Sequence, residues 1–267
     1  RHGFRQFQNL EGEEALKWGS LKIGQKNFFW QHAHNDYLKK PPLFAALEHG
    51  ITSIEVDVFD VKGEVRIAHI PLFLKNKPLL KDQYLAPLAQ RISQNGGTVF
   101  KNDSTQLILM IELKRNHSDL LQLLKTELEP YHELIDIPRG NNKRWGPIKI
   151  LLTGGVSTKL ISSDELAIFT IDGGLSSLNN KIDPNLVPRI SMNYTSHFKW
   201  KGRGKMPEAE KKWLIETINQ ANALGYEIRF WNMPNKEVIW EEFLRLGVHR
   251  INIDEYERFA RFKSKMN

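Results

Sequence analysis

Two acidic residues alternate with β-branched residues in the stretch Ile54-Glu55-Val56-Asp57-Val58. Because side chains on a β-strand point alternately to its two faces, Glu55 and Asp57 share one face and the apolar residues share the other. Two carboxylates at neighbouring positions of a buried face repel each other and lose hydration. A divalent cation relieves that conflict, and Mg²⁺ and Ca²⁺ both prefer oxygen ligands. The stretch therefore predicts two metal ligands, with a solvent-exposed polar strand face as the alternative.

A third carboxylate stands at the end of the apolar run over residues 107–111, where Glu112 is followed two residues later by Lys114. The same alternation places Glu112 and Lys114 on one strand face. Glu112 would complete a cation site made of three carboxylates, and the lysine adds a positive charge suited to a phosphate group. The alternative is a plain Glu–Lys ion pair where the strand ends.

Three histidines are placed to exchange protons or to bind substrate beside this site. His32 and His34 follow the apolar run at residues 28–30, and His69 ends the run at residues 65–68. Because histidine titrates near neutral pH, His32 and His69 are predicted to act as acid and base. His34 is predicted to contact substrate or metal. The alternative for each is a structural histidine that hydrogen-bonds to nearby backbone.

Short apolar runs separated by amphipathic helical patterns must position these side chains. The predicted strands cover residues 28–33, 53–59, 106–113, 148–153, 166–171, 187–192, 227–231 and 250–253. The predicted helices cover residues 41–49, 118–129, 207–224 and 236–246. Eight strands that alternate with helices predict a single α/β domain with the (β/α)8, or TIM-barrel, fold. An open doubly wound sheet is the alternative, although the first strand–helix turn lacks the GxGxxG pattern.

Three segments lie outside this alternation. The Lys62-Gly63 turn predicts a β-hairpin after the second strand. Residues 70–103 show no periodicity, and we expect a long loop that is functional or locally structured. Residues 1–27 are expected to form an extension that caps the barrel, with a helix over residues 11–19.

The carboxyl ends of the strands form the catalytic face of a TIM barrel. Asp172 and Asn193 end two of the predicted strands, so both are predicted to face the same mouth and to contact substrate. Asp172 also precedes two glycines, a pattern that is equally typical of a plain turn.

The composition is that of a globular protein, with 40% hydrophobic and 26% charged residues. The chain has no cysteine, which excludes disulfides, thiolate zinc sites and cysteine nucleophiles. Lys and Arg number 38 against 31 Asp and Glu, and the resulting net charge of +7 favours anionic ligands or membranes. Because the basic residues are dispersed and no nucleic-acid motif is present, no nucleic-acid partner is predicted.

The ends of the chain and its hydropathy bear on location. No apolar run approaches the roughly 20 residues of a membrane span, so no transmembrane segment is predicted. The chain begins Arg1-His2-Gly3 without Met. We therefore expect a processed or trimmed chain, secreted or periplasmic, from which a signal peptide has been removed.

Taken together, these residues resemble the glycerophosphodiester phosphodiesterase and phosphatidylinositol-phospholipase-C-like superfamily. That pattern has a His after the first strand, Glu-x-Asp on the second, a later His, and Glu-x-Lys on the third. The matching residues are His32, Glu55 with Asp57, His69, and Glu112 with Lys114. Residues 226–232 and 247–254 look like the last two barrel strands, and the resemblance implies that Trp231 points inward to substrate.

Residues 32–37, His-Ala-His-Asn-Asp-Tyr, resemble the branch of that superfamily named after the yeast "altered inheritance of mitochondria" proteins. The branch implies a TIM barrel and a phosphodiesterase activity. Two departures from the glycerophosphodiesterases stand out. Those enzymes usually have His-Arg-Gly where this chain has His-Ala-His, and an acidic residue where this chain has Ile70.

The resemblance implies a metal-dependent phosphoric diester hydrolase that acts on a glycerophosphodiester- or phosphoinositide-like substrate. The three carboxylates would hold Mg²⁺ or Ca²⁺, His32 and His69 would act as acid and base, and Lys114 would offset charge on the phosphoryl group. In the wider family the substrate's own neighbouring hydroxyl often attacks, which gives a cyclic phosphate. The expected partner is a small phosphodiester or a lipid head group. The alternative is a barrel that binds an anionic head group or a glycan without turnover.

Overall fold

Strands and helices alternate along the chain in the computed structural model, which describes residues 31–115 and 117–266. The strands are β1 (Gln31–Ala33), β2 (Ser53–Asp60), β3 (Val65–Ile67), β4 (Leu107–Leu113), β5 (Ile148–Thr153), β6 (Phe169–Gly173), β7 (Arg189–Asn193), β8 (Glu227–Trp231) and β9 (Arg250–Ile253). The α-helices are α2 (Phe44–Glu48), α3 (Ala86–Gln94), α4 (His117–Leu128), α5 (Leu175–Asn179), α6 (Tyr194–His197), α7 (Glu208–Leu224), α8 (Glu237–Leu246) and α9 (Tyr256–Met266).

The strand order establishes the fold. Hydrogen bonding runs in the order β1-β9-β8-β7-β6-β5-β4-β2-β3, and β1 also pairs with β2. The strands other than β3 therefore close into a ring of eight within the described residues. β2, β4, β5 and β6 pair in parallel, as do β7, β8 and β9. This is the (β/α)8 barrel that the sequence predicts, and β3 is the antiparallel hairpin strand added beside β2.

Several predicted elements need correction. The predicted strand over residues 166–171 starts late, because a helical turn over Asp164–Leu166 precedes β6. Backbone bonds from Leu166 N to Ser163 O and from Ala167 N to Asp164 O close that turn. The strand predicted from residue 187 begins after Pro188, which has no N–H to donate to a ladder.

The first predicted helix, over residues 41–49, is shorter than expected. Only Phe44–Glu48 is helical, because Leu43 has a φ of 64° and cannot belong to a right-handed helix. Its backbone N–H donates instead to the side chain of Asp36 at 2.6 Å. The stretch over residues 70–103 is locally structured, as expected, and contains α3. The predicted extension over residues 1–27, with its helix over 11–19, and the start of the strand over 28–33 lie outside the described residues.

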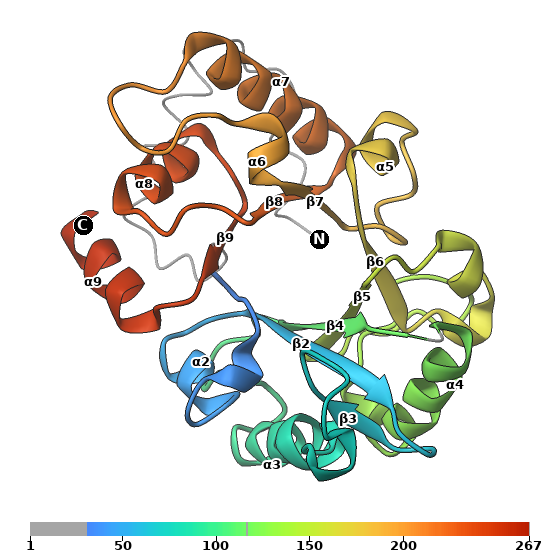
Figure 1. Ribbon diagram of the computed structural model, residues 1–267. Coiled ribbons are helices and arrows are strands. Elements are labelled where there is room, and N and C mark those ends of the chain that lie inside the picture. Colours follow the sequence, from blue (N-terminus) through green and yellow to red (C-terminus); the bar gives the residue numbers. More distant parts are fainter. Residues whose placement is uncertain (1–30, 116, 267) are drawn as a thin grey trace. The chain divides into compact units, whose positions relative to one another are not determined.

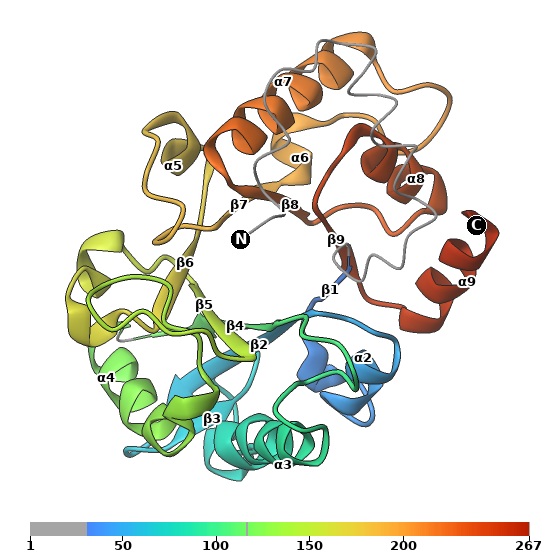
Figure 2. The ribbon, with the colours of Figure 1, turned by 180° about the vertical axis from the view of Figure 1, so that it is seen from behind.

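Residues 33–172 form one of two compact units of the chain. In this unit α4 packs against β2, β3 and β4. Figures 1 and 2 show α3 and α4 along one side of these strands. The packing buries an apolar stripe of α4 that consists of Leu120, Leu121, Leu124 and Leu128. The apolar faces of β2 and β4 therefore meet helices, which leaves the opposite faces for polar side chains.

Residues 173–266 form the described part of the other unit, together with Gln31 and His32 of β1. Its core is aromatic: Phe198 packs against Phe230 and Phe243 with ring centroids 5.3 Å and 5.2 Å apart. α8 and α9 pack against each other through Trp240 and Phe259, whose ring centroids lie 5.0 Å apart. Such edge-to-face ring contacts add to the stabilisation from buried area.

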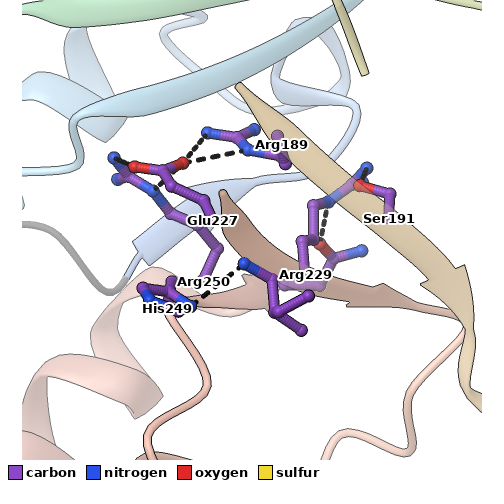
Figure 3. A network of polar contacts seen from close by, with 8 residues as sticks. Arg189, Ser191, Glu227, Arg229, His249 and Arg250 are labelled. Atoms are coloured by element: carbon purple, nitrogen blue, oxygen red, sulfur yellow. Dashed lines mark hydrogen bonds and ion pairs between the residues drawn. The ribbon is translucent and has the colours of Figure 1, made fainter. Parts of the chain in front are cut away.

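A buried ion network stands at the starts of β7, β8 and β9 (Figure 3). Glu227 accepts hydrogen bonds from Arg189 and from Arg250, each at 3.0 Å. The side chains of the two arginines are only 1% and 3% exposed. Burial alone would raise the pKa of Glu227, but the charges of Arg250 and Arg189 outweigh it and hold that pKa well below its usual range. Glu227 therefore stays ionised and neutralises one of two buried guanidinium charges.

We expect Glu227→Gln to lower the free energy of unfolding by about 3 kcal/mol, because losing one member of a buried ion network leaves charge uncompensated. Urea unfolding measures this loss. Since the folded-state pKa is lowered, the contribution of Glu227 is fully present above the unfolded pKa of about 4.3 and is lost as pH falls further. The difference in the free energy of unfolding between wild type and variant should thus be constant near neutral pH and shrink below about pH 4.

The matched control is Glu216→Gln, which removes an exposed pair with Lys212 at 3.9 Å on α7. Exposed pairs contribute about 0–1 kcal/mol, so little change is expected. Equal losses in the two variants would show that the buried network stabilises the fold no more than a surface pair does.

No helix in the described residues has both the length and the apolar character that crossing a membrane requires.

Candidate functional site

Two neighbouring parallel strands carry the acidic residues. In the pairing of β2 with β4, Asp57 lies opposite Glu112, and Glu55 lies opposite Met110. Val56, between the two acids of β2, is fully buried on the other strand face. Because side chains alternate along a strand and paired residues point the same way, Glu55, Asp57 and Glu112 project from one face of the sheet.

The three carboxylates converge on one point, as predicted. One oxygen from each of Glu55, Asp57 and Glu112 lies within 4.8 Å of the others. Asp57 is fully buried and Glu55 is 5% exposed. The Glu112 side chain keeps 27% of its surface exposed, so the group is reached from solvent on that side.

Asp57 engages only one of its two oxygens. Its Oδ2 accepts from the Tyr37 hydroxyl and from Lys114 Nζ, each at 2.9 Å, and lies 2.9 Å from His69 Nδ1. Its Oδ1 is buried and has no hydrogen-bond partner. A buried carboxylate oxygen without a partner is destabilising, so Oδ1 is the atom at which a ligand would relieve the fold.

Lys114 bridges two of the acids, since Nζ lies 2.9 Å from both Asp57 and Glu112. Burial lowers the pKa of Lys114, but hydrogen bonds to Glu112 and Asp57 raise it more, so the net direction is upward and the ammonium group stays charged. When all three carboxylates are ionised, they and the ammonium group together carry a net charge of −2. A divalent cation neutralises that charge.

The surroundings of Glu112 oppose its ionisation. Burial raises the pKa of Glu112; the hydrogen bond from Lys114 lowers it in part, and the charges of Asp57 and Glu55 raise it again. The net pKa lies above the ordinary value. A cation bound by the three carboxylates would favour the ionised form of Glu112.

The β2–β3 hairpin brings His69 to the acidic group. Ala68 N donates to the backbone oxygen of Asp57 at 3.1 Å, and the next residue places its ring Nδ1 at the Asp57 side chain. The His69 side chain is 57% exposed, so the rest of the ring is accessible to a ligand from solvent.

The other two histidines flank the end of β1. His32 lies within the strand and is fully buried, whereas His34 begins the following turn and is partly exposed. The residue between them, Ala33, pairs with Ile54 of β2. The predicted position at the carboxyl end of the first strand is confirmed, and the roles of the two histidines stay predictions.

Tyr37 belongs to the site although the sequence analysis did not select it. Its hydroxyl donates to Asp57 Oδ2 at 2.9 Å and lies 3.3 Å from His69 Nδ1. Burial raises the pKa of Tyr37, and the charge of Asp57 raises it further, so the phenol keeps its proton. The preceding residue, Asp36, fixes the position of the loop after β1, because its buried carboxylate accepts a hydrogen bond from the Tyr84 hydroxyl at 2.7 Å.

Gly154, directly after β5, is a second residue of the site that the sequence pattern did not predict. Its φ is +92°, and a Cβ atom there would lie 2.5 Å from the Leu113 oxygen and 3.1 Å from Glu112 Cγ. A larger residue would have to displace Glu112 or the end of β4. Glycine is therefore needed here for both its backbone conformation and its size.

These features fit a hard divalent cation. The donor set consists of carboxylate oxygens, which suit Mg²⁺ and Ca²⁺ better than metals that favour sulfur or imidazole ligands. The unpartnered Asp57 Oδ1 and the negative charge of the three carboxylates also favour a bound cation. The residues present are therefore able to hold such an ion.

Comparison with known proteins identifies the family. The profile described as "AIM6-like phosphodiesterase domain" matches residues 27–169, more than half of the chain and all of the acidic group. The chain belongs to the AIM6-like phosphodiesterase family. The resemblance noted from residues 32–37 is thereby confirmed.

Fungal relatives of this AIM6-like phosphodiesterase domain extend the match. "Altered inheritance of mitochondria protein 6" of Saccharomyces cerevisiae (strain ATCC 204508 / S288c) is 26% identical over 266 residues, which cover 84% of this chain and 68% of the relative. The protein of the same name from Eremothecium gossypii is 26% identical over 270 residues, with 86% and 68% covered.

A solved structure shares the barrel of the AIM6-like domain. A glycerophosphodiester phosphodiesterase from Parabacteroides distasonis superposes with a TM-score of 0.55 at 15% identity, covering 88% of this chain and 97% of that chain. The likeness shows a common fold.

Three further residues were predicted to contact substrate in this AIM6-like domain. Asn193 is the last residue of β7, as predicted, and Asp172 is the last residue but one of β6. The Asn193 side chain accepts a hydrogen bond from Thr195 N at 3.1 Å, and it thereby caps and stabilises the start of α6. Trp231 ends β8 and is 43% exposed. Their contact with substrate stays a prediction.

Proposed function

We propose that this protein is a metal-dependent phosphoric diester hydrolase. The observation that carries the proposal is Asp57 Oδ1, a buried carboxylate oxygen without a partner inside a group of three carboxylates. Lys114 and His69 complete the surroundings of that group. Membership of the AIM6-like phosphodiesterase family and the fold shared with a glycerophosphodiester phosphodiesterase support the same class of reaction.

In this proposal, Glu55, Asp57 and Glu112 hold the divalent cation, Mg²⁺ or Ca²⁺. Such a cation, when bound, acts as a Lewis acid toward a phosphoryl oxygen. Lys114 keeps Asp57 and Glu112 in place through its two contacts at 2.9 Å, and it offsets the negative charge that builds on the phosphoryl group.

Two histidines move protons in the proposed reaction. His69 Nδ1 faces an Asp57 oxygen that can only accept, so Nδ1 carries the proton and Nε2 is left for the substrate. His32 takes the second role, as the resemblance implies. One histidine removes the proton of the attacking hydroxyl while the new P–O bond forms. The other gives a proton to the alkoxide as the old P–O bond breaks.

The proposed substrate is a small phosphodiester or a lipid head group of the glycerophosphodiester or phosphoinositide type. A cavity of about 210 Å³ borders His69 and Tyr37 and offers room for the alcohol part of such a molecule. His34 stands three residues from Tyr37 and is proposed to contact the same substrate.

The proposal is tested by incubating the protein with a panel of phosphodiesters, with added Mg²⁺ or Ca²⁺ and with a chelator. The expected result is hydrolysis of at least one diester that stops on chelation and returns with the cation. Cation-dependent binding of a diester without turnover would replace the proposal by a non-catalytic head-group binder. Hydrolysis that chelation leaves unchanged would remove the metal from the mechanism.

We expect Tyr37→Phe to lower kcat about tenfold or more while KM changes little, because hydrogen bonds to a charged group contribute about 1.5–3 kcal/mol. The change removes the hydroxyl that lies between Asp57 and His69 and keeps the ring. Steady-state kinetics on the best substrate of the panel measure it. Tyr131→Phe, outside the site, is the control, and an equal loss there would count against a positioning role for Tyr37.

A further inference from the structure

Large apolar side chains are exposed on two loops beside the site. Leu38 is 63% exposed, Ile70 54%, Leu72 52% and Phe73 74%. They make up four of the eight large apolar side chains found exposed in the described residues. Leu38 follows β1, and the other three follow β3. The clustering of exposed apolar groups in two short segments is unusual for a solvated surface.

The two loops meet at the cavity next to His69. Leu38 and Ile70 both line it, together with Lys77 and Tyr37. The exposed apolar groups therefore begin at the rim of the candidate site rather than at a remote surface. We call residues 37–40 and 70–77 the apolar rim.

The charged residues of the apolar rim are all basic. Its two segments read Tyr-Leu-Lys-Lys and Ile-Pro-Leu-Phe-Leu-Lys-Asn-Lys, with four lysines and no acidic residue. Lys40 and Lys75 are exposed. Lysine is depleted in the centres of protein–protein interfaces, whereas apolar groups flanked by lysine are typical of segments that lie in the surface of a lipid membrane.

The backbone at Phe73 supports an external partner. Phe73 has a φ of 53°, a left-handed conformation that is unfavourable for a bulky residue. Its ring is the most exposed of the large apolar side chains described, so packing within the fold does not compensate. Strain of this kind persists mainly where a binding function uses it.

We propose that the apolar rim docks on an anionic lipid surface. Leu72 and Phe73 enter the boundary between head groups and acyl chains, and Lys40 and Lys75 pair with anionic head groups. This brings the cavity beside His69 to the level of the head groups. The inference goes beyond the proposed hydrolase activity, because lipid binding is measured without any turnover.

The test is co-sedimentation of the full chain with vesicles of phosphatidylcholine, with and without phosphatidylserine. We expect binding that increases with phosphatidylserine and weakens with salt. The double change Leu72→Ser and Phe73→Ser should weaken it at least about tenfold, given the apolar area withdrawn from water. Lys40→Glu with Lys75→Glu should remove the preference for phosphatidylserine.

The matched control is Trp145→Ser, which removes an apolar side chain 53% exposed in the same unit but outside the apolar rim. It should bind vesicles as the wild type does. Unchanged melting temperatures would show that all variants fold, since every altered side chain is exposed. The proposal is overturned if the wild type does not sediment with either vesicle, or if the rim variants bind as tightly as the wild type.

Activity separates this inference from the proposed function. The Leu72→Ser and Phe73→Ser protein should hydrolyse a water-soluble diester at the wild-type rate and a vesicle-borne diester more slowly. If no diester is hydrolysed at all, the proposed function fails while vesicle binding still decides the docking surface.

Discussion

Replacing Glu112 by glutamine should abolish most of the stabilisation that Mg²⁺ or Ca²⁺ gives to this protein. A ligand at about 100 times its Kd stabilises a folded protein by about 2.7 kcal/mol. If the amide weakens binding about 100-fold, the same relation leaves about 0.4 kcal/mol at that concentration. Thermal melts of both proteins with and without cation measure the difference.

Glu127→Gln is the matched control for this experiment. Burial raises the pKa of Glu127 as it does that of Glu112, but Glu127 is not part of the acidic group. Its variant should keep the full response to cation. A response in Glu112→Gln equal to that of the wild type would show that Glu112 is not a ligand.

Without cation, the glutamine variant should be the more stable protein, and the difference should grow with pH. The folded-state pKa of Glu112 is raised, so the stability from its protonated form is fully present below the unfolded pKa of about 4.3. That stability is lost as pH rises through the raised folded pKa. Cation affinity of the wild type should rise over the same interval, because only the ionised carboxylate binds a metal.

His69→Ala should lower kcat/KM about 10²–10⁴-fold, which corresponds to about 3–5 kcal/mol of transition-state stabilisation. The ring is held at Nδ1 by Asp57, and no other described contact places a second imidazole at that oxygen. We expect a loss of the same size in His32→Ala. Kinetics on the true substrate measure both.

An activated substrate assigns the two roles. A p-nitrophenyl phosphodiester has a leaving group that needs little protonation, so it should restore activity to whichever variant has lost the acid. The variant that has lost the base should stay inactive. Wild-type rates in both variants on the true substrate would refute the two-histidine mechanism.

Two controls accompany these variants. The cation-induced stabilisation should survive both changes, because neither histidine is proposed as a ligand. His132→Ala removes an imidazole of similar exposure, 56% against 57%, that pairs with Glu133 outside the site. It should retain full activity, and a comparable loss there would mean that the assay reports a general effect on the fold.

Local patterns were sufficient to predict which side chains share a face. Alternation in β2 places Glu55 and Asp57 together, and alternation in β4 places Glu112 with Lys114. These assignments need only the two-residue period of a strand and the apolar residues between the acids. For the same reason the predicted bounds of β5, β8 and β9 agree with the structure.

Local patterns failed where a distant contact competes with the local preference. The pattern predicts a helix from residue 41, yet Leu43 N–H donates to Asp36, and the helix begins three residues later than predicted, at Phe44. Tyr37 lies within the motif over residues 32–37, but nothing in that motif shows that the loop folds back onto Asp57, 20 residues away.

The barrel class, the acidic residues and the strand faces that carry them can be read from the amino-acid sequence, because each follows from a period of two residues or from the alternation of strands with helices. Three features come from the folded chain alone: Asp57 pairs opposite Glu112, Tyr37 and His69 meet at one Asp57 oxygen, and Gly154 leaves room for Glu112. These features depend on strand register, which the packing of helices between parallel strands sets; a slip of one residue would turn every acid of the strand to the opposite face.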